Sequence, residues 1–361
     1  MASSSCSSSF FFVLLLIAAA TTTTTTLLPT SSLTAAQSIN NLTAALDLVS
    51  DACAIDVAAK ERNFDNVKNI FERQGGLKQT ASAFPADSAA ATAGAVARAI
   101  DGHGPTYMKP TLCSSMPYRS EMIRKGVSGI LLNLATDLLA SEGDDVDTDV
   151  IAMLLGSAAV GGEPKSCTPV AKMDRRASEF GASEQHIGHG RDHINEQLAA
   201  MREAVRNNDA ASASNARNAL LEELNIAPVQ GALKYAALID PSAGSITYGE
   251  LDKERAEAIA YIYPVMNQIG KCQAALGSAR VIEEALSCSP ENVMPVGVNE
   301  EDIVTTSRSV TDDGIYSRVL NAIEKAYSCL AVMSGDAAEF KEHVGIYRGE
   351  RAGLTPEGFQ D

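Results

Sequence analysis

The sequence contains no tryptophan, and aromatic residues make up only 5% of its 361 residues. No C-x-x-C pair occurs, which argues against a thiol redox motif and against a cysteine-rich zinc knuckle. The chain also lacks the G-x-S-x-G elbow, the P-loop and the dinucleotide fingerprint in a strand–turn–helix context. Only five histidines are available for a Ser-His-Asp triad. We therefore expect a protein that is not an enzyme of these classes.

Basic residues are scarce as well. The chain has 29 Lys and Arg against 45 Asp and Glu, which gives a formal net charge of -16 at pH 7. Binding to nucleic acid or to an anionic membrane requires a basic face, so both partners are disfavoured. Cationic ligands stay open, although acidity also serves simply to keep an extracellular protein soluble.

Charged residues are absent from the first forty positions, where Phe10 to Ala20 form an apolar run too short to span a bilayer. We predict a secretory signal peptide within residues 1–36, cleaved after Ala20 or near Ala36. A plastid transit peptide is the alternative. The mature protein is expected to be secreted or periplasmic, without a membrane span, and to carry a glycosylation sequon at Asn41.

Six cysteines remain once Cys6 leaves with the signal peptide, an even number that suits an oxidising compartment. We expect three disulfides, and fifteen connectivities are open. Three of these cysteines precede the histidine cluster and three follow it, so a fully paired set needs at least one bond between the two halves. The six are Cys53, Cys113, Cys167, Cys272, Cys288 and Cys329.

Abundant alanine and the lack of alternating Val, Ile and Thr predict a mostly α fold with ten to fourteen helices. Apolar residues at helical spacing predict one helix from Pro117 to Gly143 and another from about Asp312 to Met333. Asp192 is predicted to cap a third helix. The capping box Thr247–Glu250 precedes a fourth, in which Pro264 is expected to kink or interrupt the helix.

A weak internal repeat points to two helical lobes, which we place at residues 37–182 and 183–361, the latter with a C-terminal tail. The alternative is chance similarity between alanine-rich helices. At offsets of 141, 143 and 141 residues, the repeat matches Tyr107 with Tyr248, Tyr118 with Tyr261, and Gly129 with Gly270.

Histidines cluster in the pattern H-x-x-H-x-x-x-H, formed by His186, His189 and His193. On a helix these three imidazoles share one face and could bind a late first-row metal. The pattern is not H-E-x-x-H, and Gly188 and Gly190 weaken a helix there. The cluster is therefore interpreted as a connector and helix start, with a metal-dependent hydrolase as a third functional hypothesis.

Tyrosines at the repeated positions form a second candidate metal site. Phenolate is a hard, charged oxygen donor of the kind that ferric iron prefers, and metal coordination can deprotonate a phenol. A tyrosine in a helical protein more often packs in the core with its hydroxyl bonded at the edge. Arg119 and Arg255 could hold an anion such as carbonate beside a metal.

Taken together, the secretory signal, the acidic alanine-rich helical chain, the segments GPTY and ITYGEL and the terminal EFKEHVGIYRGERAGLTPEGF resemble a green-algal family. It is the low-iron-inducible, high-CO2-inducible periplasmic protein family of iron assimilation, which is similar to the phytotransferrins. The resemblance implies a protein that binds Fe(III) with carbonate for delivery to cell-surface iron-uptake proteins. It also implies two phenolates, one imidazole and one carboxylate at a single site.

On matching residue types, the implied ligands are Tyr107 and Tyr248 first, Tyr118 and Tyr261 second, and one of His103, His189 or His193. The second half has Ala243-Gly244 where the first has His103, so one iron site is expected, not two. The alternative is a periplasmic structural or interaction protein, induced by CO2 or metal status, whose tyrosines only pack.

Overall fold

A computed structural model describes residues 39, 41–84, 88–103, 115–141, 147–157, 165–181, 190–240, 246–287, 303–304 and 314–347. Within these ranges the protein forms fourteen α-helices and one sheet of two short strands. The predicted mostly α, disulfide-stabilised fold is confirmed. None of the described helices has the length and apolar character needed to cross a bilayer.

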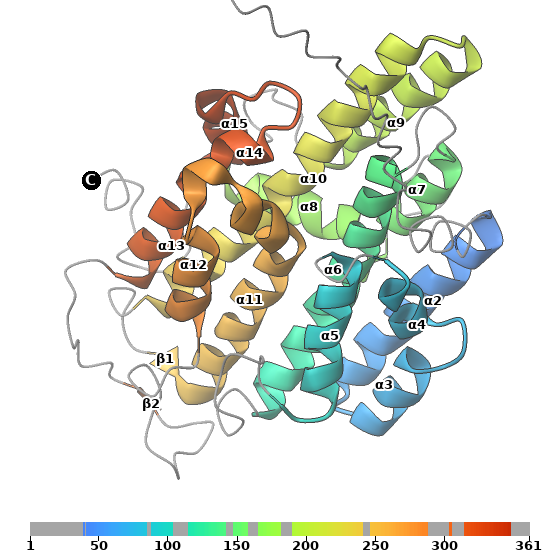
Figure 1. Cartoon of the computed structure of the whole chain (residues 1–361). Coiled ribbons are helices and arrows are strands. Elements are labelled where there is room, and N and C mark those ends of the chain that lie inside the picture. Colours follow the sequence, from blue (N-terminus) through green and yellow to red (C-terminus); the bar gives the residue numbers. More distant parts are fainter. Residues whose placement is uncertain are drawn as a thin grey trace, which may run out of the picture.

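The first half of the chain supplies seven helices, which are shown from blue to green in Figure 1. They are α2 (Leu42–Lys60), α3 (Phe64–Phe71), α4 (Leu77–Ser82), α5 (Ala89–Ile100), α6 (Met116–Ser141), α7 (Thr148–Leu155) and α8 (Pro169–Glu179).

The second half supplies the other seven helices and both strands. They are α9 (Arg191–Arg206), α10 (Ala210–Ile239), β1 (Ile246–Thr247), α11 (Tyr248–Lys271), the 3-10 helix η5 (Gln273–Ala275), α12 (Ser278–Leu286), β2 (Ile303–Val304), α13 (Ile315–Glu324), α14 (Tyr327–Leu330) and α15 (Ala337–Val344). The strands pair antiparallel, with Ile246 opposite Val304.

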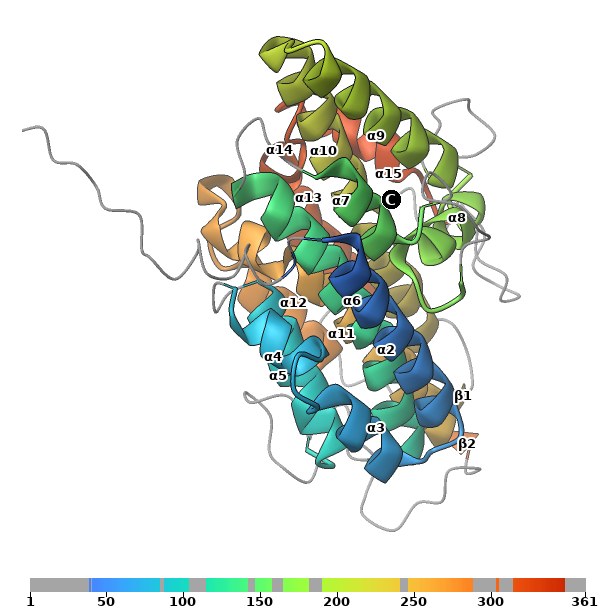
Figure 2. The same cartoon turned by 90° about the vertical axis from the view of Figure 1, so that its right-hand side faces the viewer.

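Helices α6 and α11 lie in the middle of the molecule in both views (Figures 1 and 2). They run parallel, because Lys125 of α6 is 3.4 Å from Glu257 while Gly129, one turn later, meets Pro264. Helix α5 runs antiparallel to α6: Arg119 bonds the Ala99 carbonyl at the end of α5.

On the other side, α10 runs antiparallel to α11, since Asn225 donates to Gln268 at 3.0 Å while Gly231, later in α10, packs against Tyr261. One continuous apolar core contains residues from both halves of the chain. The two predicted lobes are therefore not confirmed: residues 37–182 and 183–361 share this core, and α6 of one half packs directly on α11 of the other.

Most predicted helix boundaries are present, with two differences. The capping box at Thr247 and Glu250 starts α11 as predicted. Pro264 lies inside α11 but does not end it, because α11 is held between α6 and α10 on both sides. Helix α9 is capped by Gly190, so Asp192 lies in its first turn and is not the cap.

The helix predicted up to Met333 is also different. Helix α13 ends at Glu324, and a separate short helix, α14, follows from Tyr327 to Leu330. Residues 312–313 lie outside the described ranges. The apolar positions Val319, Ile323 and Leu330 do face the core, but the chain turns at Lys325 and Ala326, and Ala326 is fully buried.

Two disulfides fasten the helices, and both support the oxidising compartment expected from the cysteine count. Cys53 of α2 bonds Cys167, just before α8, and Cys272 at the end of α11 bonds Cys329 of α14. Cys113 and Cys288 lie outside the described residues. Asn41 caps α2 through its side-chain oxygen, 2.8 Å from the Ala44 amide. The amide nitrogen that a glycan would use is not part of that bond.

Candidate functional site

The phenol of Tyr118 lies inside the core, in the first turn of α6. Its side chain is fully buried, and within the described residues no hydrogen-bond partner of its hydroxyl is found. Burial raises the pKa of Tyr118, the nearby Tyr263 and Asp252 raise it further, and Arg98 and Arg255 oppose them. One further phenol, one carboxylate and two guanidinium groups thus act on the buried Tyr118 phenol. We call these five residues the Tyr118 cluster.

Three helix ends supply four residues of this cluster, whereas Tyr263 lies further along α11. Arg98 is in the last turn of α5, Tyr118 is in the first turn of α6, and Asp252 and Arg255 follow the capped start of α11. Asp252 and Arg255 are three residues apart, which puts them on neighbouring positions of one helix face. They are 1% and 3% exposed, so their charges act at low solvent screening.

His103 lies at the same end of the molecule, two residues after the C-cap of α5. Its backbone amide donates to the Arg98 carbonyl at 2.7 Å, and its side chain is exposed. Tyr248 is the first residue of α11, but its side chain lies outside the described part, as do Tyr107, His186 and His189. The predicted pairing of Tyr107 with Tyr248 therefore stays a prediction.

Tyr261 occupies different surroundings, in the middle of α11. Its ring stacks on that of Tyr235 at a centroid distance of 5.7 Å, and the Arg176 guanidinium lies 5.5 Å from it. Burial raises the pKa of Tyr261, while Lys125 and Arg176 lower it. Tyr261 thus has a lysine among its cationic neighbours, whereas the cations beside Tyr118 are both arginines. Tyr118 and Tyr261 are the tyrosine ligands predicted second. Of these two, only Tyr118 has a carboxylate and no lysine among the neighbours that shift its pKa.

Charged residues line the contact between α6 and α11. Lys125 lies 3.7 Å from Glu121 and 3.4 Å from Glu257. Burial and the charge of Glu257 raise the pKa of Glu121. Burial also acts to raise the pKa of Glu257, but Lys125 and the hydrogen bonds with Glu121 and Tyr235 together outweigh it and lower that pKa. The two carboxyl groups thus share one negative charge, which Lys125 balances.

Arg119, a predicted anion ligand, is used in the fold. Its guanidinium donates to the carbonyls of Ala99 and Ile100 at the end of α5, and it lies 4.0 Å from the centre of the Phe64 ring. These bonds satisfy carbonyls that a helix end leaves unpaired. Arg255 and Arg98, not Arg119, are the arginines that act on Tyr118.

His193 lines a wide acidic cleft of about 800 Å³ between α9, α10 and the turn before α15. On its far side His343 is 3.4 Å from Glu222, which raises the pKa of the imidazole. Glu222 also accepts the Met333 amide at 2.9 Å, so it is held in place. The cleft thus presents His193 with carboxylates, away from the Tyr118 cluster.

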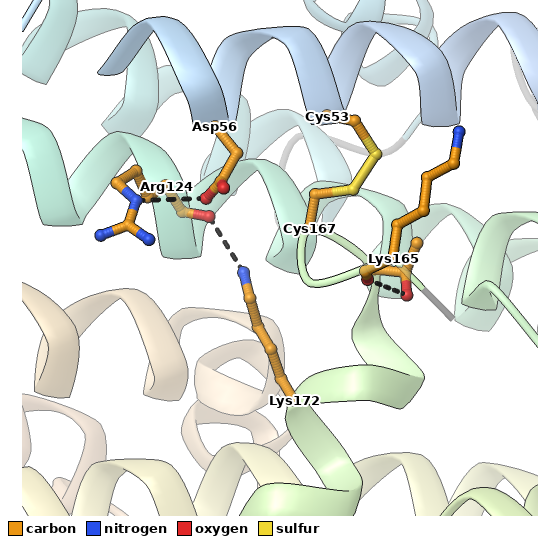
Figure 3. Close-up of a disulfide and its surroundings, with 7 residues drawn as sticks. Cys53, Asp56, Arg124, Lys165, Cys167 and Lys172 are labelled. Atoms are coloured by element: carbon orange, nitrogen blue, oxygen red, sulfur yellow. Dashed lines mark hydrogen bonds and ion pairs between the residues drawn. A yellow bond between two sulfur atoms is a disulfide. The ribbon is translucent and has the colours of Figure 1, made fainter. Parts of the chain in front are cut away.

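The Cys53–Cys167 disulfide holds the start of α8 against α2 (Figure 3). One turn after Cys53, Asp56 pairs with Arg124 of α6 at 3.2 Å. Lys172 of α8 reaches the same place and donates to the Arg124 carbonyl at 3.0 Å. The disulfide and these two bonds fix the position of α8 relative to α2 and α6.

Arg98, Asp252 and Tyr263 are not among the ligands predicted from the sequence. Their common signal is a charged or phenolic residue at a helix position that the apolar pattern assigns to the core. No group of three His, Cys, Asp or Glu side chains with metal-binding geometry exists within the described ranges. A metal at the Tyr118 cluster would depend on phenolate oxygens.

Comparisons with protein-family models, with curated proteins and with solved structures found no match.

Proposed function

We propose that this protein is a secreted or periplasmic binding protein, not a catalyst, that captures ferric iron at the Tyr118 cluster. The single observation behind this is that the Tyr118 phenol is fully buried, has no hydrogen-bond partner among the described residues, and has its pKa raised by burial and by the nearby Tyr263 and Asp252. Phenolate and carboxylate oxygens are hard, charged donors suited to Fe(III). The resemblance to the algal iron-assimilation family, drawn from the sequence, points the same way.

Arg98 and Arg255 give the cluster a place for an anion. Guanidinium groups bind planar oxyanions through paired N–H donors, and carbonate has this shape. Carbonate would then supply further oxygen ligands to the iron. His103 is the predicted imidazole that we assign to this site, because its backbone amide is bonded to the Arg98 carbonyl.

Acid should release the iron. The pKa of Tyr118 is raised, so its phenol is protonated in the free protein, and iron must displace that proton to bind. Protons compete in the same way for carboxylate and carbonate. Affinity therefore falls as the pH falls.

The test is a titration of the purified protein with ferric iron. A visible phenolate-to-iron charge-transfer band is expected that requires bicarbonate and fades below about pH 5. Tyr118→Phe should abolish most of the band. Tyr327→Phe is the matched control, because Tyr327 is also a buried phenol but packs against Phe340 in α14 and α15, and it should keep the band.

A protein that stays colourless in iron and bicarbonate would contradict the proposal. It would favour the structural or interaction protein, for which the complete burial of Tyr118 is ordinary core packing. That alternative predicts no iron retained after dialysis.

A further inference from the structure

A small cavity lies where α6, α8, α10 and α11 meet. Prolines interrupt the hydrogen bonding of both long helices there, with Pro228 in α10 and Pro264 in α11, and Gly129 of α6 faces Pro264. Its volume is about 30 Å³, counted as the space that the centre of a water-sized sphere can occupy. This is room for a molecule of a few atoms. Most of its lining is apolar, including Leu132 and Met173.

Lys172 of α8 lines this cavity, together with Lys125. The Lys172 side chain is half-buried, and its Nζ points towards α6, where the Arg124 carbonyl accepts one N–H at 3.0 Å (Figure 3). Within the described residues no carboxylate lies at ion-pair distance from this Nζ, unlike that of Lys125. In the described part of the chain, Lys172 thus forms no ion pair, and it lies beside a cavity.

The surroundings favour the neutral amine. Burial lowers the pKa of Lys172 to about 7, with further lowering by Lys125 and Arg124 that Asp56 and Glu257 only partly offset. A neutral amine has a free lone pair and is a nucleophile near neutral pH.

We propose that Lys172 is a carbamylation site, at which its Nζ adds dissolved carbon dioxide that enters the cavity. The nitrogen lone pair forms a bond to the carbon of CO2, and one C=O bond opens to give a carboxylate oxygen. The nitrogen then loses a proton to solvent. The product is a lysine carbamate with one negative charge, and no oxidant, reductant or cofactor takes part.

Charge selects this product over others. The change converts a neutral amine into an anion between Lys125 and Arg124, whose positive charges disfavour an ammonium group but stabilise a carbamate. An imine formed from an aldehyde becomes a cation on protonation and gains nothing from these neighbours. The apolar lining admits uncharged CO2, whereas bicarbonate would lose its hydration on entry.

The modification has a defined pH dependence. At a fixed concentration of dissolved CO2, the carbamate fraction rises as pH increases through about 7, because only the neutral amine reacts. Helix α10 lines the cavity with Ala227 and Pro228 and adds no charge there. The charged and titratable groups that face Lys172 are Arg124 and Lys125 of α6, Asp56 of α2, and Glu257 and Tyr261 of α11.

The experiment uses the iron-free full-length protein in 13C-labelled bicarbonate, adjusted at each pH to the same concentration of dissolved CO2, with 13C NMR and alkyl trapping followed by peptide mass spectrometry. One carbamate signal is expected at pH 8, at least fivefold weaker at pH 6, and the trapped group should map to Lys172. Lys172→Met should remove the signal. Lys165→Met, which removes an exposed lysine seven residues earlier, and Tyr118→Phe should leave it unchanged.

Three results would overturn the inference: no carbamate signal from the folded wild-type protein, a signal that persists in Lys172→Met, or labels spread evenly over surface lysines. Circular dichroism of each variant checks that it is folded, and wild-type trapping is decisive even if Lys172→Met is not. The inference does not rest on iron binding. Tyr118→Phe separates the two bicarbonate effects, because it should lose the iron band and keep the carbamate.

Discussion

Lys125 of α6 and Glu257 of α11 form an ion pair at 3.4 Å that is almost completely enclosed, with side-chain exposures of 14% and 4%. It joins the central helices of the two halves of the chain. Two buried charges lose much hydration energy, and their attraction offsets that loss only while both are present. Removing one partner of the pair is therefore far more destabilising than replacing both partners with uncharged residues.

Replacing Lys125 with methionine should lower the free energy of unfolding by about 3 to 5 kcal/mol, because Glu257 is left charged and buried. Urea denaturation measures this. The control Lys78→Met breaks a surface pair with Glu72 at 2.7 Å and should cost less than about 1 kcal/mol. Adding Glu257→Gln to Lys125→Met should recover part of the loss. Equal losses of unfolding free energy in Lys125→Met and Lys78→Met would show that the buried pair stabilises the protein no more than the surface pair does.

The pair of His343 and Glu222 should make stability depend on pH. Glu222 raises the pKa of His343 above 6.5. The stability that protonated His343 contributes is therefore fully present below about pH 6.5 and is lost as the pH rises through the pKa of His343 in the folded protein. Although burial opposes it, His343 with the Met333 and Ser334 amides lowers the pKa of Glu222 below 4.5, so that contribution is lost in acid.

His343→Gln should therefore be more destabilising at about pH 5.5 than at about pH 8.5. The difference should stay below about 1 kcal/mol, because both side chains are partly screened by solvent. Denaturation curves at the two pH values test this. A larger effect at the higher pH would show that the sign is wrong.

A third disulfide between Cys113 and Cys288 is predicted. The two observed bonds use two cysteines from each half, and the only cysteines left in the expected mature chain are these two. Peptide mapping without reductant should find this link. Loss of any one of the three bonds should cost about 2 to 4 kcal/mol through the freedom regained by the unfolded chain. Two free thiols in the purified protein would contradict the prediction.

Gly231 allows α10 and α11 to approach closely. A Cβ added there would lie 2.3 Å from Cγ of Tyr261, so Gly231→Ala should destabilise the protein by about 1 to 3 kcal/mol despite the better helix propensity of alanine. Gly94→Ala in α5 is the control. Its nearest neighbour is the flexible end of Arg98 at 3.6 Å, so it should stabilise by about 0.5 to 1 kcal/mol. Thermal denaturation compares the two.

Local sequence signals located the helices well. The capping box at Thr247 and the apolar spacing after Pro117 are interactions within one helix, so neighbouring residues determine them. The end of α13 was missed because a buried turn at Ala326 replaces the helix there, and its packing partners lie elsewhere in the chain.

The candidate site could be predicted only in part. Tyr118 was chosen from the repeat, but the repeat could not show that Tyr261 faces Lys125 and Arg176. Charged side chains such as Asp252 and Glu257 are usually at the surface, so a sequence offers no reason to place them in a core. Their burial follows from the parallel packing of α6 on α11, which is a tertiary relationship.

The most direct test of the central claim is X-ray diffraction from iron-loaded crystals at the iron absorption edge. The account predicts one anomalous peak within bonding distance of the Tyr118 phenol oxygen and the Asp252 carboxylate, and its loss in Tyr118→Phe. A peak in the acidic cleft between His193 and His343 instead, or none from protein soaked in ferric iron and bicarbonate, would contradict it.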